Sequence, residues 1–181
     1  KDAAGYEGTI ELWLDKEVQS FKDPGYIYSD GAPPPDWDKE DAFKPAMLCL
    51  RSTDNVVMTR MILEKPHASL SIEKLYGTAA PVYLLEQDYT QPMGSYNGPI
   101  TEFAEVVNGK ILFLKARDLK TGERERIGVM GSLKYAWRIV PSINGKRKDI
   151  LKAKYHPDPD APAKADPLPF VTDYIRIFFN G

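Results

Sequence analysis

Five closely spaced basic side chains form the most prominent group in this sequence that could bind a ligand. They lie in the segment KRKDILKAKY and are Lys146, Arg147, Lys148, Lys152 and Lys154. Residues 110–154 hold 13 Lys/Arg against 4 Asp/Glu, whereas residues 1–109 hold 9 against 18. A basic segment in an acidic chain can contact a polyanion such as RNA, or pair with acidic side chains of the same chain or a neighbouring copy. We therefore take these five residues as the candidate nucleic-acid or polyanion contact.

A second group consists of carboxylates that could hold a metal ion. The segment PDWDKED contains four of them at nearly alternating positions: Asp36, Asp38, Glu40 and Asp41. Oxygen ligands in such a pattern suit Ca²⁺. The spacing lacks the glycine of a calcium-binding helix–loop–helix, so a solvated acidic loop is the competing interpretation.

Aromatic side chains in turn-rich segments form the third group. Trp37, Tyr89 and Tyr96 are flanked by Pro, Gly, Asp and Asn. Rings exposed in loops can stack on a sugar or on another small ligand, and they can equally anchor a loop to the core. These three residues are the candidate site for a glycan or small ligand.

Signs of catalysis are weak. The chain has no G-x-S-x-G elbow and no phosphate-binding glycine pattern, and its two histidines, His67 and His156, each lie beside a proline. We therefore expect no enzyme, although the two carboxylates of a glycosidase need no fixed spacing. Cys49 lies in the apolar run AMLCL and is expected to be a buried, inert thiol that forms no internal disulfide.

The segments that must position these groups read mainly as β-strands. Alternating apolar residues predict a strand at 7–15, two strands around Asp54-Asn55 at 46–64, and a strand at 81–89. Asn108-Gly109 predicts a hairpin over 100–117, with Ala104 opposite Phe113 and Glu102 opposite Lys115. Segment 68–77 suits a strand or a short helix, and we favour the helix or an irregular turn.

The C-terminal third continues this pattern. A strand at 133–139 places Leu133, Tyr135, Trp137 and Ile139 on one face, and Asn144-Gly145 turns the chain into the basic segment 146–155. Because lysine commonly protects edge strands, this segment is expected at a sheet edge. Residues 156–169 hold five prolines and predict a stiff linker. Segment 170–181 predicts a last strand, largely buried on both faces, which needs a partner on each side.

These segments predict an all-β chain with at most one or two short helices, built as an antiparallel sandwich, jelly roll or barrel. We divide it into a β-sandwich domain at 1–155, a linker at 156–169 and a terminal strand or arm at 170–181. The long Pro-rich stretch at 23–45 is expected to be a loop. No apolar run is long enough for a membrane span, and the first residues show no signal-peptide pattern.

Two segments together resemble the jelly-roll shell domain of small icosahedral RNA virus coat proteins. They are GTIELWLDKEVQSFKDPG (8–25), which is similar to a strand that ends in an acidic residue before a loop with Asp and Pro, and GVMGSLKYAWRIVP (128–141), which is similar to a late strand with alternating aromatics. The resemblance covers about residues 8–141. The chain departs from the family in having no basic N-terminal arm and few strands before residue 8.

The resemblance implies a jelly-roll β-sandwich that assembles with copies of itself in a virion, with calcium between subunits and the basic segment facing RNA. We therefore expect a non-enzymatic structural subunit, most concretely a viral capsid protein. The alternative is a secreted or periplasmic β-sandwich module that binds a glycan or other small ligand.

Overall fold

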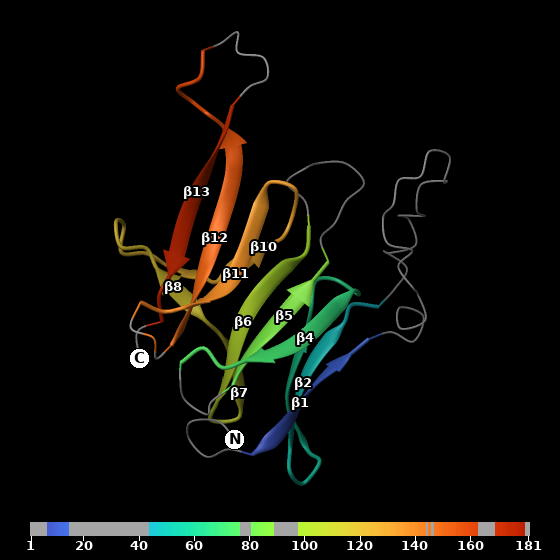
Figure 1. The fold of residues 1–181 in the computed structure, drawn as a ribbon. Helices are drawn as coiled ribbons and strands as arrows, with labels where there is room; N and C mark the ends of the chain where they lie inside the picture. The colour runs from blue at the N-terminus through green and yellow to red at the C-terminus, as the bar shows by residue number, and fades with distance from the viewer. Residues whose placement is uncertain are drawn as a thin grey trace, which may run out of the picture.

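The described part of the chain forms thirteen β-strands and contains no helix (Figure 1). The computed structural model describes residues 7–14, 44–76, 81–88, 98–143, 145, 147–162 and 169–179. The strands are β1 (Gly8–Trp13), β2 (Met47–Ser52), β3 (Val57–Ile62), β4 (Ala68–Glu73), β5 (Val82–Gln87), β6 (Ile100–Val107), β7 (Lys110–Phe113), β8 (Lys115–Arg117), β9 (Arg124–Arg126), β10 (Gly128–Met130), β11 (Tyr135–Pro141), β12 (Lys148–Pro157) and β13 (Phe170–Ile177). The expected all-β class is confirmed.

The strands form three antiparallel sheets and a two-stranded ribbon. The first sheet has the order β1-β2-β3, and the third has the order β11-β12-β13. The central sheet has the order β10-β6-β5-β4, with β7 also paired to β6, while β8 and β9 form the ribbon. Only the β6–β10 pair joins strands that are not consecutive within their sheet, so the described topology consists mainly of meanders.

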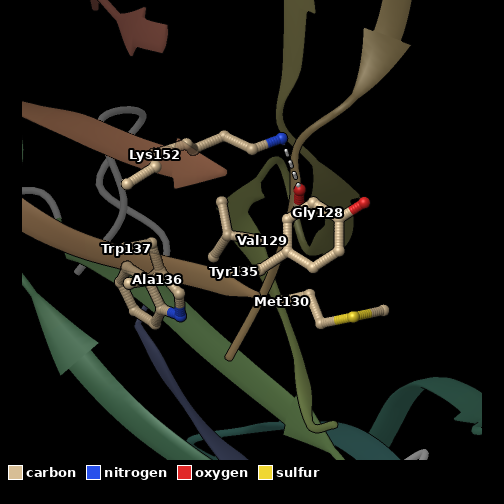
Figure 2. A pocket seen from close by; sticks show the side chains of 8 residues that line it. Gly128, Val129, Met130, Tyr135, Ala136, Trp137 and Lys152 are labelled. Atoms are coloured by element: carbon tan, nitrogen blue, oxygen red, sulfur yellow. Dashed lines mark hydrogen bonds between the residues drawn. The ribbon is translucent and has the colours of Figure 1, made fainter. Parts of the chain in front are cut away.

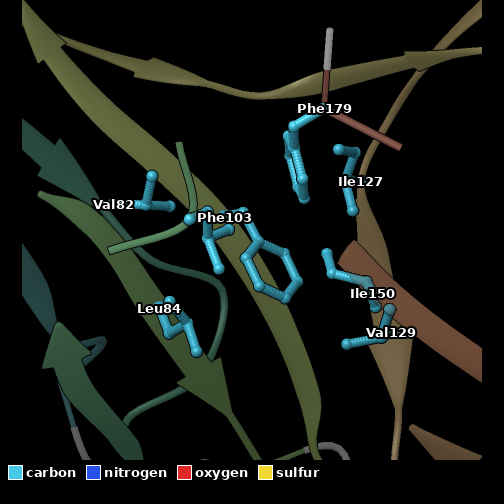
Figure 3. Close-up of a cluster of buried hydrophobic side chains, with 8 residues drawn as sticks. Val82, Leu84, Phe103, Ile127, Val129, Ile150 and Phe179 are labelled. Atoms are coloured by element: carbon cyan, nitrogen blue, oxygen red, sulfur yellow. The ribbon is translucent and has the colours of Figure 1, made fainter. Parts of the chain in front are cut away.

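The middle strands of the central sheet, β5 and β6, are covered on both faces by the other two sheets. On one face Leu48 and Leu50 of the first sheet pack against Leu85, Ala104 and Ile111. The opposite face packs against the third sheet and the residues that follow it, in a cluster that contains Val82, Leu84, Phe103, Ile127, Val129, Ile150 and Phe179 (Figure 3). A strand covered on both faces needs apolar residues at consecutive positions, which explains the sequences VYLLEQ and ITEFAEVV.

The predicted hairpin at Asn108-Gly109 is confirmed in its first part. Both turn residues have positive φ (49° and 72°), and Ala104 pairs with Phe113. The predicted pair of Glu102 with Lys115 is wrong, because the chain leaves β6 at Leu114, forms the ribbon, and returns along the same edge as β10. Glu102 therefore pairs with Gly128, and its carboxylate binds the guanidinium of Arg126 at 2.6 Å.

Three further expectations are wrong. Segment 68–77 is favoured as a helix or turn by the sequence, but its first part is strand β4, which pairs along its whole length with β5. The basic strand β12 is not an edge, because β11 and β13 flank it. The terminal strand β13 is not largely buried on both faces, since Phe170, Tyr174 and Ile175 are exposed.

Other expectations hold. Ile10, Leu12 and Leu14 face the core, and Asn55 forms the β2–β3 turn with positive φ. Cys49 is buried, which raises the pKa of its thiol. The domain division remains a prediction. The proposed boundary after residue 155 falls inside β12, and β13 pairs with that same strand.

A close backbone contact joins the start of β6 to the end of β10. The amide of Gly131 donates to the carbonyl oxygen of Pro99 at 3.0 Å. A Cβ atom on Gly98 would lie 1.8 Å from the carbonyl oxygen of Gly131, so no side chain fits there. Glycine at position 98 thus allows β10 to align beside β6 and to lead into the third sheet.

We expect Gly98→Ala to lower the free energy of unfolding by at least about 2 kcal/mol, because backbone must move to admit the methyl group. Chemical denaturation measures this loss. Gly128→Ala is the control, since the nearest atom to its Cβ would be 3.7 Å away. Equal stability of the two variants would contradict the proposed contact.

Ionisation of Glu105 of β6 lowers the free energy of unfolding, so the stability of the central sheet depends on pH. Burial raises the pKa of its carboxyl, and burial followed by the charge of Glu105 raises the pKa of Tyr76 to about 12. Because the pKa of Glu105 is higher in the folded chain, folding favours its protonated form. Its contribution to stability therefore falls as the pH rises from the unfolded pKa through the folded one.

We expect Glu105→Gln to stabilise the protein at pH 7 by up to about 1 kcal/mol, and to have no effect below the unfolded pKa of Glu105. Denaturation at several pH values measures the difference. Glu123→Gln, at an exposed position, is the control. A difference independent of pH would show that ionisation of Glu105 is not its cause.

Candidate functional site

Two of the residues predicted as a polyanion contact, Arg147 and Lys148, are engaged in contacts within the chain. Arg147 donates to the carbonyl oxygen of Phe179 at 2.9 Å, and the ammonium of Lys148 lies 2.8 Å from the carboxylate of Glu73. The Lys148 contact holds the third sheet against β4 of the central sheet, whereas the Arg147 contact joins the start of β12 to the residues that follow β13. Lys146 lies outside the described residues. The polyanion role of the set remains a prediction.

Lys152 and Lys154 lie on the face of the third sheet that is turned toward the central sheet. Their side chains share this face with Ile150, because alternate residues of a strand point the same way. Lys154 is exposed near the end of the face, opposite Tyr135 and Asp173. Lys152 is half-buried, and its pKa is lowered mainly by this burial.

The side chain of Lys152 enters a pocket of about 240 Å³ where β10 meets the third sheet (Figure 2). The pocket is lined by Gly128, Val129, Met130, Tyr135, Ala136, Trp137, Lys152 and Ala153. Its walls are mainly apolar, and the Lys152 Nζ atom donates to the carbonyl oxygen of Gly128 at 3.3 Å. The sequence indicated Lys152 as basic and placed Trp137 on an apolar strand face, but their meeting in one pocket depends on the β11–β12 register.

The position of the terminal strand depends on a buried ion pair. Asp149 of β12 is 2% exposed, and its carboxylate lies 2.8 Å from the Nε atom of Arg176 on β13. The same guanidinium donates to the carbonyl oxygen of Pro141 at 2.7 Å, so Arg176 connects all three strands of the sheet. Sequence reasoning missed this pair, since Asp149 appeared as one acid within a basic run.

The outer face of β13 and its free edge carry exposed apolar side chains. Tyr174 is 67% exposed, Phe170 is 59% exposed, and Phe178 is also exposed, whereas the exposed Ile175 pairs with Lys152 and lies on the opposite face. Tyr155 of the neighbouring strand lies on the same outer face as Phe170 and Tyr174 and extends this surface. We call the exposed side chains of Tyr155, Phe170, Tyr174 and Phe178 the terminal apolar surface.

A cluster of polar side chains around Glu102 lies on the central sheet. Glu102 binds Arg126 through both carboxylate oxygens and accepts a hydrogen bond from Gln87 at 3.3 Å. Burial raises the pKa of Glu102, with Arg126 opposing this effect. The guanidinium also lies over the ring of Phe113, 3.2 Å from its centroid. The contacts of Arg126 with Glu102 and Phe113 fasten the ribbon to the sheet.

The other predicted site residues lie outside the described residues. They are the metal candidates Asp36, Asp38, Glu40 and Asp41 and the ligand candidates Trp37, Tyr89 and Tyr96. Within the described ranges, no group of three or more metal-ligating side chains comes together, and no helix is long and apolar enough to cross a membrane. Calcium binding and the loop site remain predictions.

The terminal apolar surface and the pocket at Lys152 are the features of the described structure that bear on function, because comparison with known proteins gives no match. No family model, no curated protein and no solved structure matches this chain.

We expect Arg176→Met to destabilise the chain by about 3 kcal/mol, because it leaves the buried carboxylate of Asp149 without its cation. Thermal or chemical denaturation measures the loss. Combining it with Asp149→Leu should recover part of the stability, since no buried charge then remains.

Arg138→Met is the matched control. Arg138 is exposed on the outer face of β11, and its replacement should change stability by less than about 0.5 kcal/mol. Similar losses for Arg138→Met and Arg176→Met would contradict a special role for the buried pair.

Proposed function

We propose that this chain is a non-enzymatic structural subunit that associates with copies of itself through β13. The observation that supports this proposal is the terminal apolar surface, placed on a strand whose second edge has no partner among the described residues. An uncovered strand edge carries unpaired N–H and C=O groups and can add a strand from another chain. Exposed aromatic side chains beside that edge add apolar area to such a contact.

The usual protections of an edge strand are missing from β13. Its sequence FVTDYIRI has no lysine and no proline, and its pairing with β12 continues without a bulge from Phe170 to Ile177. Its two charged side chains, Asp173 and Arg176, bind His156 and Asp149 of β12. Neither charge is therefore directed to repel an approaching strand, and the eight-residue edge is about 26 Å long.

The most concrete form of this proposal is a viral coat subunit of jelly-roll type. It rests on the resemblance of residues 8–25 and 128–141 to coat-protein strands. A jelly roll pairs strands that are distant in sequence, and β6–β10 is one such pair among the described strands. In this form repeated contacts between subunits would close a shell, with the remaining basic side chains facing RNA and the 36–41 carboxylates facing calcium.

Light scattering after size-exclusion chromatography tests the association. We expect the parent chain to form dimers or larger species that grow with protein concentration, and Phe170→Lys/Tyr174→Lys to elute as a monomer of 20.4 kDa. Two added lysines place like charges at the contact and protect the edge. A parent chain that stays monomeric at all concentrations would contradict the proposal.

Leu119→Lys is the control, because Leu119 is 88% exposed at the tip of the β8–β9 ribbon. It should associate like the parent. Electron microscopy of the parent, with and without RNA and a calcium chelator, then tests the coat form: closed particles support it, and a discrete dimer contradicts it while leaving the β13 contact intact.

A further inference from the structure

The pocket at Lys152 is independent of the terminal apolar surface. Lys152 points to the inner face of the third sheet, whereas Phe170 and Tyr174 lie on the outer face. The pocket is formed by three strands whose positions are set by backbone pairing: β10 against β6, and β11 against β12. Its shape therefore depends on the fold of one chain.

The ammonium group of Lys152 has unused hydrogen-bonding capacity. A protonated lysine carries three N–H donors, and the described part of the chain accepts one, at the rather long distance of 3.3 Å to Gly128. No described carboxylate lies within ion-pair distance, although Glu125 acts on Lys152 from farther away. Burying a cation without an anion is costly, so an anion entering the pocket would be stabilised.

The walls restrict what this anion can be. Val129, Tyr135 and Trp137 present apolar and aromatic surface, which favours a flat apolar body. The packing of Trp137 against Phe103, with ring centroids 5.8 Å apart, holds the indole ring in place. Because the lining contains one cation, it suits a single negative charge. A volume of about 240 Å³ suits one ring, since drug-sized ligands occupy pockets of about 300–1,000 Å³.

We propose that the pocket between β10, β11 and β12 binds a small aromatic monocarboxylate. The carboxylate accepts hydrogen bonds from the Lys152 ammonium, and the ring lies against Val129, Tyr135 and Trp137. The lysine thereby gains the anionic partner that the described chain does not provide. The binding is noncovalent, and it requires no association between copies of the chain.

Fluorine NMR with para-fluorobenzoate tests this site, and para-fluorobenzamide is the uncharged probe of nearly equal shape. We expect the benzoate signal to broaden and shift on titration with the full chain, with millimolar affinity, and the benzamide to bind at least about tenfold more weakly. This comparison uses the unaltered protein, so it does not depend on how any variant folds.

Variants then locate the site. Lys152→Met keeps an apolar side chain of similar length and should weaken benzoate binding at least about tenfold, while benzamide binding stays unchanged. Lys154→Met, on the same face but outside the pocket, is the matched control and should bind benzoate like the parent. The monomeric variant Phe170→Lys/Tyr174→Lys should also bind benzoate, which separates this site from association through β13.

Three results would overturn the proposal. They are the absence of benzoate binding by the parent at millimolar concentrations, equal affinity for benzoate and benzamide, and unchanged benzoate binding by Lys152→Met.

Discussion

The burial of both faces of strands β5 and β6 in the central sheet is the constraint on which the rest of the structure depends. Strands β5 and β6 have apolar residues at consecutive positions, so neither face can be left in water. The first sheet covers one face and the third sheet covers the other. Because two further layers are required, the C-terminal strands must fold back onto the middle of the chain. This return brings β11 and β12 against β10 and creates the pocket.

The edge of β6 is shared by two strands, and this sharing positions the C-terminal half. Strand β7 occupies one part of the edge and β10 the other, while the chain between them extends as the β8–β9 ribbon. The link between Glu102 and Arg126 fastens the ribbon where it leaves the sheet. The close approach of Gly98 and Gly131 then sets where the chain turns into the third sheet.

Basic residues that lie close together in the sequence make different contacts in the folded chain. In the sequence, residues 110–154 form a strongly basic block, but four of these basic side chains have separate contacts in the fold. Arg126 and Lys148 pair with carboxylates of the central sheet. Arg147 donates to the carbonyl oxygen of Phe179, and Lys152 enters a pocket. The terminal apolar surface on β13, by contrast, is exposed and uncharged.

The amino-acid sequence by itself determined the all-β class, most strand positions and the Asn108-Gly109 turn, because alternation and turn chemistry act over a few neighbouring residues. It also indicated that Cys49 is buried and that Lys152 belongs to a basic strand. Only the tertiary structure decided that segment 68–73 is a strand, that Glu102 meets Arg126, and that β12 is central while β13 is an edge. These outcomes depend on which strands become neighbours. Neighbour choice is set by the total apolar area buried between sheets, which is a long-range quantity that local spacing does not encode.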